Sequence, residues 1–403
     1  MPGTYSANAP LAARVLIADD QKHVLEALEF LLRDCGFSTH AVTDPAHAVA
    51  ALEADRFDAV LMDLNYTRDT TSGTEGLELV SRIRSIDETV PVLVMTAWGS
   101  VDQAVEAMRR GASDFVQKPW DNRELLEKLK NQLSTAEAER RTRRERSHEL
   151  EEAREIQDKL LPKRLPELPG YEVAGTTRPI RVVGGDYYNA VRISRQEIAF
   201  CIADVAGKGM PAALLMSSLQ AALMPLIEQR LGPRELCHRL NRMLCDLTPV
   251  GKFISFFYAV LNSSNHRLTY SNAGHNPPLL IRADGRWTEL NASGAVLGQF
   301  PDWQYEQSEL TTSVGDKLVV FTDGLVESSN VADEPFGEQN VIRIAQENPN
   351  ACAQELLSLL IEAASKHCDG NFQDDASLMV LKAVSCPSGS REHNASQVLA
   401  PSA

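Results

Sequence analysis

The stretch RVLIADD, residues 14–20, is an apolar run that ends in the carboxylates of Asp19 and Asp20. Amphipathic segments follow it, beginning at residues 24–32, and they alternate with other short apolar runs. Three of those runs are also followed by a polar side chain: FDAVLM by Asp63, PVLVM by Thr96 and SDFVQ by Lys118. Strands that alternate with helices in this way predict an α/β fold with a doubly wound parallel sheet.

The polar side chains at the ends of these runs form a candidate site. In a doubly wound sheet, sites lie at the carboxyl ends of the strands, so Asp19, Asp20 and Asp63 should meet there. Three carboxylates can hold one Mg²⁺, which takes water and phosphate oxygens as its other ligands. Asp63 could then accept a phosphoryl group, with Thr96 and Lys118 in contact with it. Taken singly, Thr96 or Lys118 would more often be a plain surface residue, and Asp19 and Asp20 could be a helix cap.

In this order and context, the five residues closely resemble the receiver domain of two-component response regulators, over about residues 14–133. The resemblance implies a five-stranded parallel sheet. It also implies that Asp63 receives phosphate from a sensor histidine kinase, and that Asp19, Asp20 and Asp63 bind Mg²⁺.

The same resemblance implies roles for three switch residues. On activation, Thr96 and the aromatic Phe115 would turn inward, while Lys118 would contact the phosphate. The loop from Asn65 to Thr74 departs from the receiver pattern, because it is longer than the usual short turn containing Met-Pro. The kinase or dephosphorylation behaviour is therefore expected to differ.

Residues 121–161 contain no glycine and are dense in charge, and their apolar residues recur at roughly helical spacing. Oppositely charged pairs four residues apart, such as Glu137 and Arg141, favour a helix. The central ERRTRRERS places Arg or Ser where a dimer seam would have apolar residues, so a coiled-coil homodimer and a solvated helix are both compatible with it. We predict a helical linker over residues 121–165, which the proline-rich run at residues 161–170 brings to an end.

A second domain is predicted over residues 166–384, and residues 385–403 have the composition of a disordered tail. Helices are expected near residues 211–230, 233–247 and 351–366. The predicted strands are EVAGTTR, EIAFCIADV, ISFFYAVL, RLTYSNA, PPLLIR, KLVVFTDG and ASLMVLK.

Four aspartate sites lie beside these strands: Gly-Gly-Asp186, Asp204 in DVAGKG, Asp323 in TDG, and the pair Asp374 and Asp375. Gathered carboxylates repel one another and are costly to desolvate, so a fold that brings them together needs a compensating cation. Two hard divalent ions can orient a bridging water, lower its pKa and neutralise charge on a phosphoryl group. The pattern therefore points to divalent metal chemistry.

The motifs of this domain resemble the SpoIIE-like branch of the PPM serine/threonine protein phosphatases. They occur in the expected order: EIQDKLLP, VVGGDYY, ADVAGKGMPAAL, SNAGHNPP, FTDGLVES and QDDAS. The resemblance implies an α+β fold, a β-sandwich flanked by helices, and two Mn²⁺ or Mg²⁺ ions. By motif, Asp186 would bridge both metals, Asp204, Asp323 and Asp374 would complete the carboxylate set, and the carbonyl of Val205 is a further candidate ligand.

Three other residues near these motifs have weaker assignments. Asp375 is a doubtful ligand that would lie behind the metal-binding carboxylates. His275, in SNAGHNPP, could donate a proton to the leaving group, but a structural histidine that stabilises a turn is the favoured interpretation. Lys208 could meet substrate phosphate, although a solvated side chain is favoured.

The composition excludes several classes of protein. A net charge of -15 over 403 residues, without a basic aromatic stripe, argues against nucleic-acid binding, and no helix-turn-helix or basic patch follows the receiver. Seven scattered cysteines without a Cys-x-x-Cys pair fit a reducing compartment. No apolar run approaches the about 20 residues of a membrane helix. A bacterial cytoplasmic protein that binds neither nucleic acid nor membrane is expected.

These features predict a response regulator with an enzymatic output. Phosphorylation at Asp63 would control removal of phosphate from serine or threonine on a partner, an anti-sigma factor antagonist by family resemblance. The alternative is a catalytically silent domain, gated by the receiver, that sequesters a partner of a sigma-factor pathway. The sequence leaves open the substrate, the direction of control, the preferred metal and the oligomeric state.

Overall fold

A computed structural model of the protein describes residues 13–66, 74–96, 101–291 and 294–385. The chain divides into two compact units, Met1–His148 and Glu149–Ala403. Most of the loop from Asn65 to Thr74, and all but the first residue of the predicted tail, lie outside the described residues.

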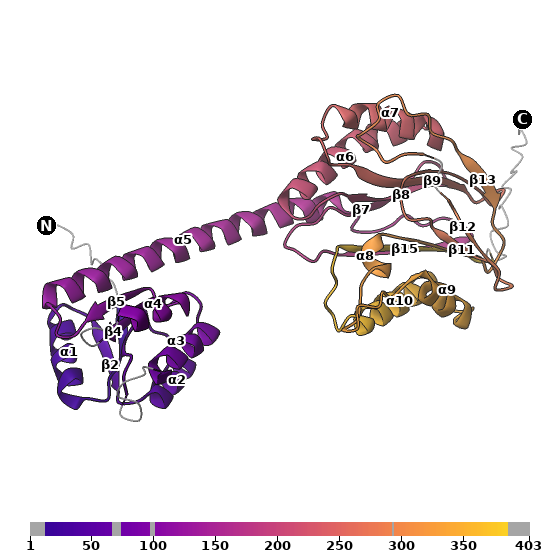
Figure 1. Cartoon of the computed structure of the whole chain (residues 1–403). Coiled ribbons are helices and arrows are strands. Elements are labelled where there is room, and N and C mark those ends of the chain that lie inside the picture. Colours follow the sequence, from indigo (N-terminus) through magenta and orange to yellow (C-terminus); the bar gives the residue numbers. More distant parts are fainter. Residues whose placement is uncertain (1–12, 67–73, 97–100, 292–293, 386–403) are drawn as a thin grey trace, which may run out of the picture. The chain divides into compact units, whose positions relative to one another are not determined.

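The first unit contains a five-stranded parallel sheet in the order β2-β1-β3-β4-β5 (Figure 1). Its strands are β1 (Arg14–Ala18), β2 (Ser38–Val42), β3 (Ala59–Asp63), β4 (Val92–Thr96) and β5 (Asp114–Gln117). Its helices are α1 (Lys22–Asp34), α2 (Pro45–Ala54), α3 (Thr74–Ile86), α4 (Val101–Arg109) and the first part of α5 (Asn122–Leu160). The predicted doubly wound sheet is therefore confirmed.

Alternation along the strands explains why helices cover both faces of this sheet. Leu16 packs in a core with α2 and α3, whereas its neighbours Val15 and Ile17 pack in a second core with α1 and α5. Successive side chains of a strand point to opposite faces, so a strand buried on both sides is apolar throughout. The runs in RVLIA and AVLM meet that requirement.

The second unit contains two antiparallel five-stranded sheets, in the orders β13-β10-β9-β8-β7 and β12-β11-β14-β15-β6. The first sheet consists of β7 (Tyr187–Arg192), β8 (Glu197–Val205), β9 (Ile254–Asn262), β10 (Arg267–Ala273) and β13 (Ser308–Thr311). The second consists of β6 (Tyr171–Arg178), β11 (Leu279–Ile281), β12 (Trp287–Glu289), β14 (Lys317–Phe321) and β15 (Ala376–Ala383). The helices are α6 (Met210–Glu228), α7 (Pro233–Cys245), α8 (Asp323–Val326), α9 (Glu338–Glu347) and α10 (Ala353–His367).

Three cores show that this unit is a sandwich flanked by helices, as predicted. Phe257 of β9 and Val320 of β14 pack in the core shared by the two sheets. Phe256, one residue earlier on β9, points the other way and packs with α6 and α7. Phe321 of β14 likewise packs outward, with α9 and α10. Figure 1 shows the helices on the two outer faces of the paired sheets.

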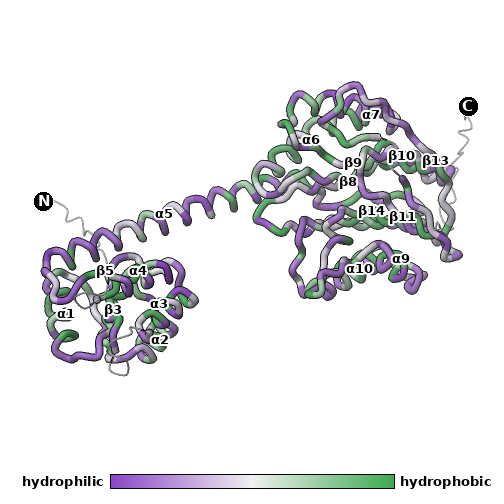
Figure 2. The backbone as a smooth tube through the Cα atoms, in the orientation of Figure 1, coloured by the Kyte–Doolittle hydropathy of each residue, from purple (hydrophilic) through white to green (hydrophobic). Residues whose placement is uncertain are grey.

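Helix α5 is 39 residues long, which confirms the predicted long helix. Near its start, Leu125 and Leu129 pack in the core of the first unit, and Leu160 at its end packs against the core of the second. The side chains of residues 141–149 between these ends are all exposed. Figure 2 shows the mainly hydrophilic character of this stretch. Whether it pairs with a second copy as a coiled coil stays a prediction.

Helix α6 is long and apolar enough to span a membrane by length and composition alone, among the helices in the described part of the chain. Half of that segment is buried inside the second unit, where Met216, Leu219 and Leu223 pack in the core. The expectation that no apolar run approaches the length of a membrane helix is therefore wrong for α6, which is apolar on most sides because it is a core helix.

In the second unit, the sequence did not lead us to expect five of the described elements: β7, β12, β13, α8 and α9. Strands β12 and β13 are only three and four residues long and mostly exposed, so their composition carries little periodic signal. Helix α8 is a single turn that begins at Asp323, directly after the Thr-Asp-Gly motif.

Candidate functional site

The receiver carboxylates meet one ammonium group at the ends of the parallel strands. Asp19 follows β1, Asp63 ends β3, and both are buried. Lys118, which follows β5, places Nζ 2.7 Å from Oδ2 of Asp19 and 2.7 Å from Oδ2 of Asp63. Carboxylate oxygens of Asp19, Asp20 and Asp63 lie within 4.8 Å of one another.

The charges of this site favour a divalent cation. Burial raises the pKa of Asp63, and the charge of Lys118 opposes that shift. Burial alone would lower the pKa of Lys118, but Asp63 and Asp19 raise it above its usual value. Three carboxylates and one ammonium leave two negative charges, which a divalent ion with oxygen ligands would balance. The residues therefore fit Mg²⁺.

The predicted switch residues occupy different environments. Thr96, at the end of β4, is buried, and its carbonyl oxygen accepts a hydrogen bond from the N–H of Lys118 at 2.7 Å. Phe115 is 38% exposed, and Nζ of Lys128 on α5 lies 5.0 Å from its ring centroid. The inward movement of Phe115 on activation stays a prediction.

Tyr66 is a residue of this site that the sequence analysis did not single out. It lies at the start of the atypical loop, three residues after Asp63, and is buried. Its hydroxyl donates to the carbonyl oxygen of Ala18 at 3.2 Å, next to Asp19. Burial and then the charge of Asp63 raise the pKa of Tyr66. The sequence signal that could have pointed to Tyr66 is an aromatic residue three positions after Asp63.

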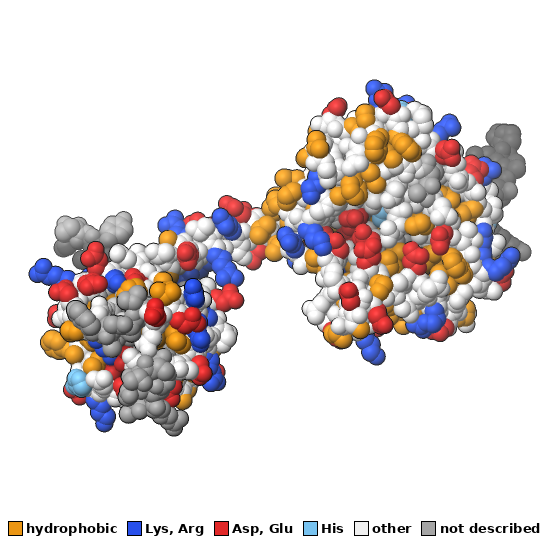
Figure 3. All heavy atoms as spheres, viewed as in Figure 1, with side chains coloured by type: hydrophobic (Ala, Val, Ile, Leu, Met, Phe, Trp, Pro, Cys, Tyr) orange, Lys and Arg blue, Asp and Glu red, His pale blue; other side chains and the backbone are white. Residues whose placement is uncertain are grey.

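The second carboxylate group lies where the two sheets of the sandwich come together. Asp186 directly precedes β7 and Asp204 lies in β8, both in the first sheet. Asp323 closely follows β14 and Asp374 precedes β15, both in the second. Acidic side chains gather on the visible face of this unit (Figure 3).

Burial and the negative charges of neighbouring carboxylates raise the pKa values of Asp186 and Asp204. Burial, and then the charge of Asp204, raise the pKa of Asp186 well above its usual value. Burial, followed by the charges of Asp323 and Asp374, raises the pKa of Asp204 to about 7. Asp204 therefore lies close enough to Asp186, Asp323 and Asp374 for their charges to act on one another, although no three of these four described carboxylates come within 4.8 Å of one another as the receiver carboxylates do.

The immediate surroundings of Asp186 fit a metal ion. Its Oδ2 accepts a hydrogen bond from Oγ1 of Thr322 at 2.8 Å. Its Oδ1 is buried and has no hydrogen-bond donor among the described residues. A buried carboxylate oxygen without a partner is costly, and a divalent cation with oxygen ligands would satisfy it. The Val205 carbonyl oxygen lies nearby, since a Cβ built on Gly185 would be 3.1 Å from it.

Asp375 has a different environment from the other carboxylates. Its Oδ1 accepts from the N–H of Ile180 at 2.9 Å, and its Oδ2 accepts from the N–H of Gly185 at 2.8 Å. Any Cβ on Gly184 would overlap the Asp375 carboxylate, so glycine is required there for a close approach. Because both oxygens already hold the backbone that leads to Asp186, we propose that Asp375 supports this loop and is not a ligand.

His275 joins the two sheets behind the site. Its Nε2 lies 3.1 Å from the carbonyl oxygen of Phe321 on β14, and its Nδ1 lies 2.8 Å from Oγ of Ser255 on β9. A carbonyl only accepts, so Nε2 carries the proton and Nδ1 accepts from the serine. Burial lowers the pKa of His275 to about 4. This neutral, doubly bonded ring favours the structural interpretation over proton donation.

Lys208 is exposed and forms an ion pair. Its Nζ lies 3.0 Å from Oδ2 of Asp374 and also donates to the carbonyl oxygen of Gln373. The side chain is therefore exposed to solvent, as the favoured interpretation has it, and it also pairs with the carboxylate of Asp374.

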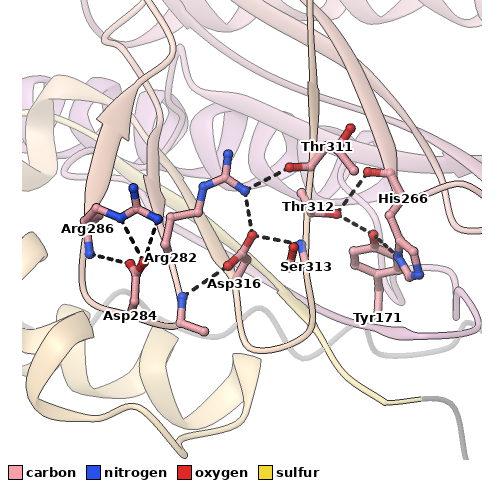
Figure 4. Close-up of polar contacts among 10 residues, drawn as sticks. Tyr171, His266, Arg282, Asp284, Arg286, Thr311, Thr312, Ser313 and Asp316 are labelled. Atoms are coloured by element: carbon pink, nitrogen blue, oxygen red, sulfur yellow. Dashed lines mark hydrogen bonds and ion pairs between the residues drawn. The ribbon is translucent and has the colours of Figure 1, made fainter.

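A recess of about 820 Å³ lies elsewhere, around the β11–β12 hairpin. Its charged groups are already paired: Arg282 with Asp316 at 2.8 Å, and Arg286 with Asp284 at 2.7 Å (Figure 4). Asp316 also accepts from two backbone N–H groups. These contacts stabilise the turns at this end of the sandwich, so we assign the recess no chemistry.

Comparison with known proteins agrees with both domains. Residues 15–130 match the response regulator receiver domain, and residues 194–384 match Stage II sporulation protein E (SpoIIE). Phosphoserine phosphatase RsbU of Bacillus subtilis (strain 168) is 33% identical over 236 residues, which are 58% of this chain and 70% of RsbU. Response regulator protein FleR of Pseudomonas aeruginosa is 39% identical over 117 residues, which are 29% of this chain and 24% of FleR.

Among solved structures, the SiaA-PP2C domain of Pseudomonas aeruginosa has a TM-score of 0.53 at 18% identity. The match covers 60% of this chain and 98% of that domain, and it shows a shared fold. Together, fold and site define a receiver domain joined to a metal-dependent serine/threonine protein phosphatase of the PPM class. The chain belongs to the SpoIIE-type phosphatases, the family of RsbU.

Proposed function

We propose that phosphorylation of Asp63 controls metal-dependent removal of phosphate from a phosphoserine or phosphothreonine on a partner protein. The observation that supports this most directly is that one helix, α5, takes part in both units. Leu129 of α5 packs in the receiver core, and Gln157 of the same helix bonds to the backbone before Asp186. A shift of that helix would therefore bear on both sites.

In the phosphatase, Asp186, Asp204, Asp323, Asp374 and the carbonyl of Val205 would hold two Mn²⁺ or Mg²⁺ ions. Such ions supply an activated water and neutralise charge on the phosphoryl group. The protein's own contribution is to orient the carboxylates that would hold these ions. Thr322 holds one oxygen of Asp186, and the other oxygen would be available to a metal ion.

In the receiver, Asp19, Asp20 and Asp63 would hold Mg²⁺, and a sensor histidine kinase would be the phosphoryl donor. Lys118 is already within hydrogen-bond distance of Asp63, so its ammonium is placed to contact the new phosphate. Thr96 and Phe115 would report that phosphate to the rest of the receiver.

The partner we propose is a phosphorylated anti-sigma factor antagonist, or a protein like it, in the bacterial cytoplasm. Support comes from RsbU, which is named a phosphoserine phosphatase. The net charge of -15 gives no support for a nucleic-acid partner. A homodimer through α5 is a further proposal.

The most informative test combines substrate and switch. The full chain would be incubated with candidate phosphorylated antagonists, with and without a small-molecule phosphodonor, while phosphate release is followed. We expect release from one class of antagonist, at a rate that the phosphodonor changes. No release from any candidate, despite hydrolysis of a generic aryl phosphate, would contradict the proposed substrate class.

The second candidate function is a silent, receiver-gated binding module. Its test is Mn²⁺-dependent hydrolysis of p-nitrophenyl phosphate by the wild-type chain and by Asp186→Asn. We expect activity in the wild type and a loss of at least about 100-fold in the variant, because a bridging ligand is removed. A variant as active as the wild type would contradict the metal assignment, and an inactive wild type would favour the binding module.

A further inference from the structure

The side-chain amide of Gln157, on α5, is bonded to both main-chain polar groups of Gly184. Its Nε2 donates to the carbonyl oxygen of Gly184 at 2.7 Å, and the N–H of Gly184 donates to its Oε1 at 3.0 Å. Gln157 is buried, with 9% of its surface exposed. Two hydrogen bonds from one planar amide fix both the position and the orientation of the glycine backbone.

The bonded glycine lies two residues before Asp186. The next residue, Gly185, donates its N–H to Oδ2 of Asp375 at 2.8 Å. The two residues before Asp186 are therefore hydrogen-bonded on two sides, to Gln157 of α5 and to Asp375, which precedes β15. Gly184 and Gly185 have no side chain that could pack against neighbouring residues, so hydrogen bonds must fix the orientation of their backbone.

Packing is also incomplete at this place. A cavity of about 100 Å³ is lined by Gln157, Gly184, Asp186 and Asp375, together with Leu161 and Thr177. Close-packed neighbours normally restrict a buried side chain, and a cavity removes part of that restriction. The amide of Gln157 is thus a main restraint on this backbone from the side of α5.

We propose that Gln157 is a positioning residue for the metal-binding carboxylate of Asp186, acting through the Gly184 peptide. Residues that orient metal ligands from behind commonly change metal affinity or activity 10- to 100-fold when they are replaced. The inference rests on the proposed function in one respect. If α5 couples the two sites, Gln157 is the group through which the helix acts on the metal-binding carboxylate.

The test uses the full chain carrying Gln157→Leu, which keeps a similar volume and removes both hydrogen bonds. Mn²⁺ binding would be measured by titration calorimetry in an Asp63→Ala background, so that the receiver site does not contribute. We expect the Kd for Mn²⁺ to rise about tenfold or more. With p-nitrophenyl phosphate, kcat at fixed Mn²⁺ should fall while KM stays within about twofold, because Gln157 is not expected to touch the substrate.

Gln132→Leu is a matched control, because Gln132 lies on the same helix and donates one hydrogen bond, to the carbonyl oxygen of Ser113 at 3.3 Å. It should leave Mn²⁺ affinity unchanged. Gln157→Glu, which has the same shape but lacks the donor to Gly184, keeps the proposal testable if the leucine variant does not fold. Wild-type Mn²⁺ affinity in the folded Gln157 variants would overturn the proposal.

Beryllofluoride, an acyl-phosphate mimic, separates this inference from the proposed receiver control. If it leaves the wild-type rate unchanged while Gln157→Leu still binds Mn²⁺ weakly, the positioning role stands and the receiver control fails. If it changes the wild-type rate while Gln157→Leu binds Mn²⁺ normally, the coupling takes another route and the Gln157 inference is wrong.

Discussion

At the scale of single residues, His275 shows how the two sheets are tied together behind the carboxylates. The ring accepts from Ser255 and donates to the carbonyl oxygen of Phe321, and it does both only when neutral. Burial favours the same neutral state, with a pKa of about 4. The stability of the phosphatase unit should therefore depend on pH through this one group.

For His275, the folded pKa lies below the usual value of 6.5. As the pH falls from about 6.5 to about 4, the unfolded chain takes up a proton that the folded chain does not. The free energy of unfolding should fall in that window, by up to about 3 kcal/mol below pH 4. Urea denaturation of wild type and His275→Gln across this range would measure the difference.

His275→Gln should lose stability at neutral pH and flatten the pH dependence between pH 4 and 6.5. His23→Gln, at an exposed position on α1, is the control and should follow the wild type. If the wild type and His275→Gln have the same slope against pH, the histidine is not held neutral in the folded state.

At the scale of elements, α5 combines buried and solvated stretches within one helix. Leu129 is fully buried in the receiver core, whereas Arg141 is 80% exposed at its side chain and pairs with Glu145 four residues on. Burial and surface pairing differ greatly in energy, so the helix should tolerate changes in its middle far better than at its ends.

We expect Leu129→Ala to lower the free energy of unfolding of the receiver unit by about 2–5 kcal/mol, because it leaves a cavity in a packed core. Arg141→Ala should change it by less than about 0.5 kcal/mol, since an exposed pair contributes little. Chemical denaturation followed by circular dichroism would measure both. Equal effects of the two substitutions would contradict this division of the helix.

At the scale of the whole molecule, the chain combines two sites with opposite relations to phosphate. The receiver residues fit a site that accepts a phosphoryl group at Asp63, and the phosphatase residues fit a site that releases one. The two lie in separate compact units, and α5 belongs to both. Regulation then requires a difference in phosphatase activity between the two states of Asp63.

Beryllofluoride should change the phosphatase rate of the wild-type chain by at least about fivefold, the lower end of typical coupling between two sites. The same treatment should have no effect on Asp63→Ala. Phosphate release and oligomer size would be measured together. Identical rates and sizes for the wild type, the treated wild type and the variant would mean that the receiver does not control the phosphatase.

Much of this architecture could be predicted from the sequence because it depends on local patterns. Apolar runs that end in Asp19, Asp63, Thr96 and Lys118 indicated the parallel sheet and its site. At the end of such a strand an apolar run stops at a polar residue, so the residue type and the end of the apolar pattern mark the same position. The aspartate motifs of the second unit were found in the same way, although their roles as ligands stay predictions.

The amino-acid sequence by itself indicated the two domains, the class of each fold and the candidate carboxylates, since these follow from residue type and short-range spacing. Only the tertiary structure decided how the carboxylates are held. Gln157 meets Gly184, Asp375 meets Gly185 and Lys208 meets Asp374 across 27, 190 and 166 positions of the chain. Hydrogen bonds between distant backbone and side-chain groups leave no periodic signal in the sequence, so folding alone brings these partners together.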